Sequence, residues 1–361
     1  MSYNFKNPIN QIGNMKSGGF IMKKNYAKTF LTLTATTALS LSLLTGCGSK
    51  ESNQESTVVQ TSQEVEASQA SQTESKAETV QAEEPVAATI DKEAFDALIA
   101  AGIVADEADI AANSWASKVK EAGVLRVGGT RTSFLFSQLD ETDNGIRGFD
   151  AGLYQLLARY ILGDESKFEV TQVDSSTRES VLQSDQVDAV FATYSITDKR
   201  KEVISFAGPY YTSNQAVLVK AGNTEITGVD SLAGKIVATQ SGSTGPDILN
   251  EFAPEATVQE FATDQEARTA LEQGRVDAYV TDYTLLLNSI VKNPNIYEIA
   301  GEVFGPEDNY GVGVPLDSDG IAFINDFLKK IEEDGTWNQL WKISLGDRTG
   351  IDTVPEAPAI K

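Results

Sequence analysis

The spacing of apolar side chains beyond residue 90 changes repeatedly between two patterns. Apolar residues three and four apart, such as Trp115 and Val119, are typical of amphipathic helices, whereas short continuous apolar runs are typical of buried strands. Between residues 91 and 203 the patterns predict helices at 92–100, 106–122, 178–182 and 198–203 and strands at 124–128, 168–173 and 187–192. Strands that alternate with helices indicate an α/β sheet.

A second series of the same kind follows Tyr211. It comprises predicted strands at 235–239, 258–261 and 276–281, helices at 245–252, 264–273 and 283–292, and a last long helix at 320–341. Extended segments at 216–219 and 310–314 would join the two series. The order predicts two α/β lobes with a ligand cleft between them, because open α/β sheets bind ligands beyond the carboxyl ends of their strands.

These patterns also suggest domain bounds. We expect lobe one to comprise 123–213 plus 309–345, and lobe two to comprise 214–308. The helical patterns at 91–122 are expected to form a spacer packed on lobe one. The tail at 346–361 contains prolines and either wraps the core or hangs free.

The first 46 residues have a different pattern. Lys23, Lys24 and Lys28 precede an apolar stretch at 30–44, and the only cysteine, Cys47, follows Gly46. This arrangement predicts a signal peptide at 22–46. It resembles the lipobox of bacterial lipoprotein precursors, in which the cysteine receives a diacylglycerol and becomes the first residue. The alternative is a transmembrane anchor, but the stretch is shorter than the roughly 20 residues that a spanning helix needs.

We expect translation to begin at Met22, so that 1–21 are not made. Residues 47–90 are rich in Ser, Glu and Gln and poor in large apolar residues, so we expect a disordered tether beyond the lipidated cysteine. Two acyl chains would hold the protein on a membrane, where a single chain gives only marginal binding. Cys47 would then serve as an anchor.

Composition excludes several classes of function. The formal net charge is −23, and without the five lysines of residues 1–46, which contain no acid, it is −28; such a surface repels nucleic acid. The absence of histidine excludes a Ser/His/Asp hydrolase and a His-ligated zinc enzyme. One cysteine cannot form an internal disulfide. We expect neither a cofactor nor a metal.

Five motifs follow one another in a recognisable order. They are Gly148-Phe149-Asp150, Val187 to Arg200 (VDAVFATYSITDKR), Phe206 to Tyr211 (FAGPYY), Gly242-Ser243-Thr244 and Gly274 to Ala278 (GRVDA). From about residue 125 to 345 the chain resembles the family 3 solute-binding proteins of polar amino acid ABC transporters. The resemblance implies the type II periplasmic-binding fold, a two-lobed clamp that closes by a hinge.

The resemblance also implies roles for particular residues. Arg200 would bind the α-carboxylate of an amino acid, assisted by Thr193 and Ser195, since a guanidinium matches a carboxylate with two hydrogen bonds. Asp282 would accept the ammonium group. From the residues alone, Arg200 can equally be a solvated helix residue and Asp282 a helix N-cap.

Other residues would complete the site. Ser243 and Thr244 precede a helix whose free N–H groups suit an anion, and so are expected to contact the carboxylate from lobe two. Asp150 is interpreted as a structural cap. Phe134 or Phe136 would supply an aromatic contact in place of Ser133, where the family often has an aromatic residue.

The selectivity residue is expected to be Arg178. It stands where acidic-amino-acid binders of the family have an arginine for the side-chain carboxylate, and Arg131 would add a second cation. The alternative is a surface ion pair of Arg178 with Glu179 or Asp174. The resemblance thus implies binding of L-glutamate or L-aspartate, with glutamine or another polar amino acid, including cystine, as the alternative.

The implied partners are a membrane permease and its cytoplasmic ATPase. We expect a lipid-anchored monomer on the outer face of the cytoplasmic membrane, where lobe closure captures the ligand. Two other functions remain open: a sensor or adhesin that uses the same clamp, and a dehydratase, for which Asp282 or Glu179 would be the acid or base.

Overall fold

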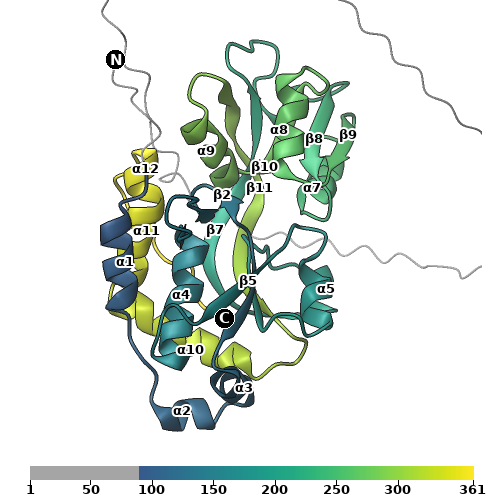
Figure 1. Ribbon diagram of the computed structural model, residues 1–361. Coiled ribbons are helices and arrows are strands. Elements are labelled where there is room, and N and C mark those ends of the chain that lie inside the picture. The colour runs from purple at the N-terminus through teal and green to yellow at the C-terminus, as the bar shows by residue number, and fades with distance from the viewer. Residues whose placement is uncertain (1–88) are drawn as a thin grey trace, which may run out of the picture. The chain divides into compact units, whose positions relative to one another are not determined.

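Two long antiparallel strands, β7 (Ser205–Lys220) and β11 (Tyr297–Val314), connect two α/β lobes in the computed structural model (Figure 1). The structure describes residues 89–361. The predicted start at Met22, the signal peptide at 22–46, Cys47 and nearly all of the tether lie outside the described residues. The extended segments predicted at 216–219 and 310–314 are parts of β7 and β11.

Lobe one is built on three parallel strands at one end of the main sheet. Its elements are β1 (Leu125–Gly129), β5 (Phe168–Gln172), β6 (Ala189–Phe191), α4 (Phe149–Leu162), α5 (Arg178–Gln183) and α6 (Asp198–Lys201). β1 lies between β5 and β6, with Val127 opposite Val170 and Ala189. A separate small sheet contains β2 (Thr132–Ser133), β3 (Ser137–Leu139) and β4 (Ile146–Arg147).

Lobe two repeats the arrangement at the other end of the same eight-stranded sheet, whose order is β5-β1-β6-β11-β7-β10-β8-β9. Its elements are η2 (Val229–Ser231), β8 (Ile236–Gln240), α7 (Gly245–Phe252), β9 (Thr257–Phe261), α8 (Asp264–Glu272), β10 (Ala278–Asp282) and α9 (Tyr283–Lys292). Alternating strands and helices in the sequence thus give parallel neighbours β10, β8 and β9. The predicted α/β architecture with two connecting segments is present.

The helices before β1 belong to the core of lobe one. They are α1 (Lys92–Ala100), α2 (Glu107–Ala111) and α3 (Ser114–Ala122). Phe95, Ile99, Trp115 and Val119 are buried in the same apolar cluster as α4. The single helix predicted at 106–122 is therefore wrong, because Asn113 caps a new helix: its Oδ1 accepts from Ala116 N.

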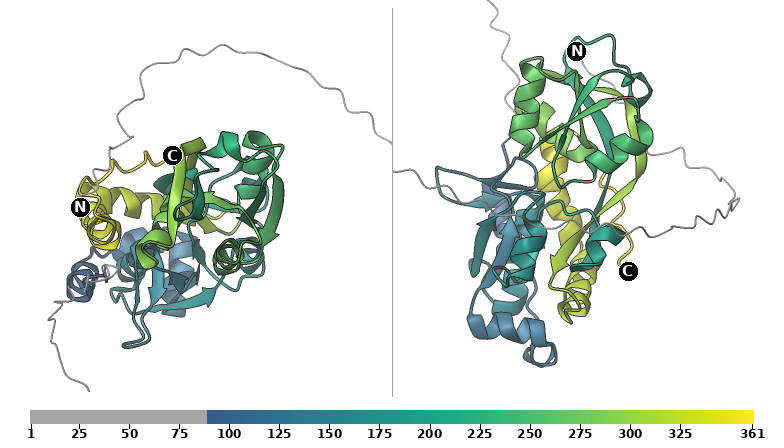
Figure 2. Two further views of the ribbon diagram at one scale, coloured as in Figure 1. Left: turned by 90° about the horizontal axis from the view of Figure 1, so that it is seen from above. Right: turned by 90° about the vertical axis from the view of Figure 1, so that its right-hand side faces the viewer.

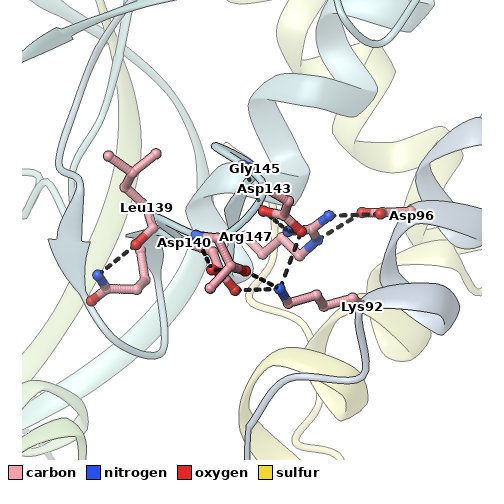
Figure 3. A network of polar contacts seen from close by, with 9 residues as sticks. Lys92, Asp96, Leu139, Asp140, Asp143, Gly145 and Arg147 are labelled. Atoms are coloured by element: carbon pink, nitrogen blue, oxygen red, sulfur yellow. Dashed lines mark hydrogen bonds and ion pairs between the residues drawn. The ribbon is translucent and has the colours of Figure 1, made fainter.

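Charged side chains join α1 to the loop between β3 and β4 (Figure 3). Lys92 contacts Asp140 and Asp143, and Arg147 contacts Asp143 and Asp96. The hydrogen bond from Lys92 lowers the pKa of Asp140 below its usual range. Most of these side chains are partly exposed, and exposed ion pairs contribute little to stability, so the apolar contacts of α1 hold it more strongly.

The C-terminal part divides into several helices. They are α10 (Gly320–Glu333), α11 (Thr336–Trp341), the π-helix η3 (Lys342–Gly346) and α12 (Asp347–Thr349). The continuous helix predicted at 320–341 is wrong because Gly335, at φ 81°, interrupts it. α11 lies against α1, as both figures of the ribbon show (Figures 1 and 2).

The last residues lie on lobe one. Ile351, Val354, Ala357 and Ile360 pack against its core. The Lys361 amide donates to the Gly208 carbonyl oxygen over 3.1 Å, and Asn325 Nδ2 donates to the Lys361 carbonyl oxygen over 3.0 Å. Of the two expectations for the tail, the structure therefore agrees with the one in which it wraps the core.

We predict that Trp115→Ala lowers the free energy of unfolding by about 3–5 kcal/mol. The indole is 6% exposed, packs near Phe323 and donates through Nε1 to the Asp188 carbonyl oxygen, so its loss leaves a cavity and an unpaired acceptor. Urea unfolding followed by fluorescence measures the change. Val104→Ala is the control, because Val104 lies in the same segment but is 53% exposed; a small effect of Trp115→Ala would contradict a shared core.

Candidate functional site

Two arginines of lobe one lie on the same aromatic ring. The guanidinium carbons of Arg178 and Arg200 are 4.2 Å and 5.0 Å from the ring centroid of Tyr194. The arginines are only 4% and 7% exposed. The interpretations of Arg178 as a surface ion-pair residue and of Arg200 as a solvated helix residue are therefore wrong.

Arg178 opens α5 and is held by main-chain oxygens. Its Nη1 donates to the Ala192 carbonyl oxygen over 2.8 Å and, less closely, to that of Thr193 over 3.4 Å. Its Nε is buried and has no hydrogen-bond partner among residues 89–361. Burial, reinforced by the charge of Arg200, lowers the pKa of Arg178 to about 10, so the side chain is still a cation at neutral pH. A buried cationic donor without a partner costs free energy unless a ligand supplies an acceptor.

Arg200 connects the two lobes. Its Nη1 donates to the Ser195 carbonyl oxygen over 2.7 Å, and its Nη2 donates across to the Gly242 carbonyl oxygen of lobe two over 2.9 Å. The nearest acid is Glu179, whose Oε1 is 3.5 Å from Arg200 Nε. Gly242 has φ 74°, and a Cβ there would lie 2.8 Å from the Ser176 Cα, so a glycine is required where the lobes touch.

Thr193 is held in an unusual backbone conformation by Asp150. It has φ 44° although it is not glycine. Its amide donates to Asp150 Oδ2 over 2.9 Å, and the Tyr210 hydroxyl donates to Asp150 Oδ1 over 2.8 Å. Asp150 is therefore not the cap of its own helix, whose N-cap is Gly148. Burial raises the pKa of Asp150 to about 7.

Two buried carboxyl groups lie on the other side of Ser195. Asp282 ends β10 and Asp308 lies in β11; they are 5% and 8% exposed. Gln215 Nε2 donates to Asp282 Oδ1 over 2.5 Å and approaches Asp308 Oδ2 at 3.4 Å. The Tyr310 hydroxyl donates to Asp282 Oδ2 over 2.6 Å. Asp282 occupies the N-cap position of α9, but its side chain makes no capping hydrogen bond, so the simple capping interpretation is wrong.

Ser195 joins the arginines to the carboxyl pair. Its carbonyl oxygen accepts from Arg200, and its hydroxyl donates to Asp308 Oδ2 over 3.0 Å. Burial, and then the neighbouring charge of Asp282, raises the pKa of Asp308 to about 8, and burial also raises the pKa of Asp282. The site thus has two cations at one end and two interacting acids at the other, an arrangement that suits a zwitterion.

Ser243 and Thr244 approach from lobe two. Ser243 Oγ donates to the Gln240 carbonyl oxygen over 2.6 Å and accepts from the Gly245 amide over 3.0 Å. Thr244 Oγ1 lies 3.4 Å from Asp308 Oδ2. Thr244 is therefore close to the carboxyl pair, while the hydroxyl of Ser243 is used within the turn before α7.

The three remaining predicted residues have other main contacts. Phe136 is fully buried and packs edge-on against Phe149 and Tyr211 in the lobe-one core. The guanidinium carbon of Arg348 lies 3.9 Å from the ring centroid of Phe134. Arg131 is exposed and its Nη2 donates to the Val170 carbonyl oxygen over 2.8 Å. Phe136 also packs edge-on against Tyr310, at 6.1 Å between ring centroids, and so lies behind the Arg178–Asp308 cluster, whereas the contacts given for Phe134 and Arg131 involve none of its residues.

Four residues of the cluster were not expected from the sequence: Tyr194, Gln215, Asp308 and Tyr310. Tyr194 lies in the motif from Val187 to Arg200, but no role was predicted for it. The other three lie on β7 and β11, which were recognised only as connecting segments. A usable signal was the acid Asp308 immediately before the predicted segment at 310–314, since a charge beside a buried strand needs a partner.

Within residues 89–361, no helix is long and apolar enough to cross a bilayer. The same residues contain no group of three or more acidic, histidine or cysteine side chains arranged to hold a metal ion.

Known proteins with similar sequences and folds are solute-binding proteins. The chain is 38% identical over 210 residues to the ABC transporter glutamine-binding protein GlnH of Bacillus subtilis, covering 58% of this chain and 76% of that one. It is 31% identical over 220 residues to the glutamate-binding protein GluB of Corynebacterium glutamicum, covering 58% and 74%. The crystal structure of the solute receptor for L-cysteine of Neisseria gonorrhoeae superposes with a TM-score of 0.64 at 26% identity, covering 68% and 99%.

The structural similarity confirms the predicted two-lobed fold of the type II periplasmic-binding class. The model of the bacterial extracellular solute-binding proteins, family 3, matches residues 125–346, nearly the range over which the motifs were recognised. The chain therefore belongs to family 3 of the bacterial extracellular solute-binding proteins.

Proposed function

We propose that this protein captures L-glutamate or L-aspartate outside the cytoplasm by lobe closure and delivers it to the permease and ATPase of an ABC importer. The observation that carries the proposal is the pair of buried arginines, Arg178 and Arg200, on Tyr194. The names of two relatives support an amino acid ligand, since one binds glutamine and another glutamate.

In the proposed complex, Arg200 binds the α-carboxylate and Asp282 accepts the ammonium group. Thr193 and Ser195 add contacts from lobe one, and Thr244 adds one from lobe two. Ser243 shapes the turn that presents Thr244, through its bonds to Gln240 and Gly245. Hydrogen bonds to charged groups contribute about 1.5–3 kcal/mol each, so a few of them reach the roughly 8 kcal/mol of micromolar binding.

The side-chain carboxylate of the ligand is assigned to Arg178. Its buried Nε has no acceptor among residues 89–361, and the adjacent Arg200 is a like charge. A dicarboxylic amino acid brings one carboxylate for each arginine, whereas glutamine leaves the charge of Arg178 without a counter-charge in a buried site. The charge arrangement therefore favours an acidic ligand over glutamine, which is the main alternative.

Lobe closure is assigned to the contacts between the lobes. Arg200 donates to the Gly242 carbonyl oxygen, and Thr244 approaches Asp308, so both lobes meet around the site. A ligand that touches both lobes favours the closed arrangement by its extra contacts there. We propose that the permease recognises this closed form of a monomer. A sensor or adhesin would bind the same ligand, but deleting it would leave uptake unchanged.

We predict that Arg200→Ala raises the dissociation constants of glutamate, aspartate and glutamine alike by about 100-fold or more, since about 3 kcal/mol of charged hydrogen bonding is lost. Isothermal titration calorimetry measures the change. Lys199→Ala, an exposed neighbour on α6, is the control and should bind normally. Retention of glutamine binding by Arg200→Ala would refute the role in holding the α-carboxylate.

Removing Arg178 should discriminate between ligands. We expect Arg178→Ala to weaken glutamate binding by about 10- to 100-fold and glutamine binding by a much smaller factor, because only glutamate presents a second carboxylate. The same calorimetric titrations, run with both ligands, give the ratio. Equal losses for the two ligands would rule out a side-chain role for Arg178 and favour glutamine or another polar amino acid.

The lipid anchor is also part of the proposal, although Cys47 lies outside the described residues. We predict that Cys47→Ser moves the protein from the membrane fraction to the soluble fraction, because a second acyl chain is what makes such anchoring lasting. Fractionation followed by mass spectrometry of the N-terminal peptide tests it. Ser49→Ala is the matched control and should remain on the membrane, whereas a Cys47→Ser protein that stays there would exclude lipidation as the anchor.

A further inference from the structure

Asp308 is the one carboxyl group of the cluster that both lobes and the connecting strands contact. Ser195 of lobe one donates to its Oδ2 over 3.0 Å. Thr244 of lobe two and Gln215 of β7 each approach the same oxygen at 3.4 Å. None of these partners is a cation, and the carboxyl group is 8% exposed. A charge in such a place requires compensation from elsewhere.

A second acid, Asp282, lies next to Asp308 and increases the need for a compensating cation. Asp282 and Asp308 interact directly and share Gln215 as a donor. Among residues 89–361 no cation forms a hydrogen bond or ion pair with either carboxyl group, and two buried carboxylates in contact repel each other, so the pair holds a proton between them. Gln215 is 1% exposed, and its Oε1 has no partner among residues 89–361, so an uncommitted acceptor also lies beside the pair.

We propose that Asp308 is a second binding residue for the ammonium group of the ligand, and that the Asp282–Asp308 pair exchanges its shared proton for that ammonium when the lobes close. This rests on the proposed function as an amino acid receptor. The incoming cation stabilises both carboxylates, so the displaced proton passes to the solvent buffer.

The other charged and titratable groups around the Asp282–Asp308 pair do not take part in this proton exchange. The charge of Arg178, on α5, acts to lower the pKa of Asp282, and that of Arg200, on α6, acts to lower the pKa of Asp308. Glu179 pairs with Arg200, and the hydroxyl of Tyr310 donates to Asp282. Gln215 of β7 and Thr244 before α7 are neutral.

The direction of the pH dependence follows from this arrangement. Below about pH 8, the raised pKa of Asp308, the empty pair retains its proton and binding must release it. Affinity should therefore rise with pH, by up to about tenfold per unit between pH 6 and 7.5, and level off above pH 8. The sequence has no histidine, so the usual source of proton exchange in this window is absent.

Calorimetry of the purified full chain with glutamate, in buffers of different ionisation enthalpy, gives the number of protons released. At pH 7 we expect about one proton per ligand for the wild-type protein and close to none for Asp308→Asn, whose affinity should also lose its rise between pH 6 and 7.5. At pH 8.5, above the pKa of Asp308, Asp308→Asn should bind about tenfold more weakly than the wild-type protein.

Asp150→Asn tests whether the released proton comes from Asp150, another buried acid with a pKa near neutral pH. Asp150 is buried with a pKa of about 7, but it contacts Thr193 and Tyr210 rather than the pair. Whatever this change does to affinity, proton release should persist. Release that disappears with Asp150→Asn and persists with Asp308→Asn overturns the inference.

Failure of the proton exchange and failure of the receptor function would give different results in these titrations. Normal wild-type binding with no proton release, or with proton uptake, overturns the proton exchange while the receptor function stands. No binding of glutamate, aspartate or glutamine by the wild-type protein overturns both.

Discussion

The antiparallel pairing of β7 with β11 holds the two lobes together and positions the acidic end of the candidate site. These strands join the two lobes, and they also carry Gln215, Asp308 and Tyr310 into the candidate site. The pairing shifts register between Ala300 and Phe304 and again before Asp308. Such irregularities re-aim side chains and end regular pairing, so the connection between the lobes and the placement of the acids have the same structural origin.

Charge placement is the second organising feature. The chain is strongly acidic overall, yet the site places two buried arginines together on Tyr194. Remote acids do little for them, since surface charges are screened beyond about 8 Å at physiological salt. Main-chain oxygens of Ala192 and Ser195 supply part of the stabilisation. The Gly242 carbonyl oxygen and the Glu179 carboxylate add to it at Arg200.

Lobe one is larger than the repeating strand and helix pattern requires. Its core includes the α1–α3 segment before β1 and the residues after α12, so both flanking segments cover the lobe. Lobe two has no such additions among the described residues.

The two α/β lobes, the two connecting segments and most helices and strands could be predicted from the amino-acid sequence, because the spacing of apolar residues shows which faces are buried. The motifs around Arg200, Ser195 and Gly242 also identified residues that the structure brings together. The position of Phe136 in the core, and the contact of Asp282 with Tyr310 in place of its own helix end, depend on how distant segments pack. Asp308 and Asp282 are 26 residues apart, and their contact depends on the pairing of distant strands, which no local pattern specifies.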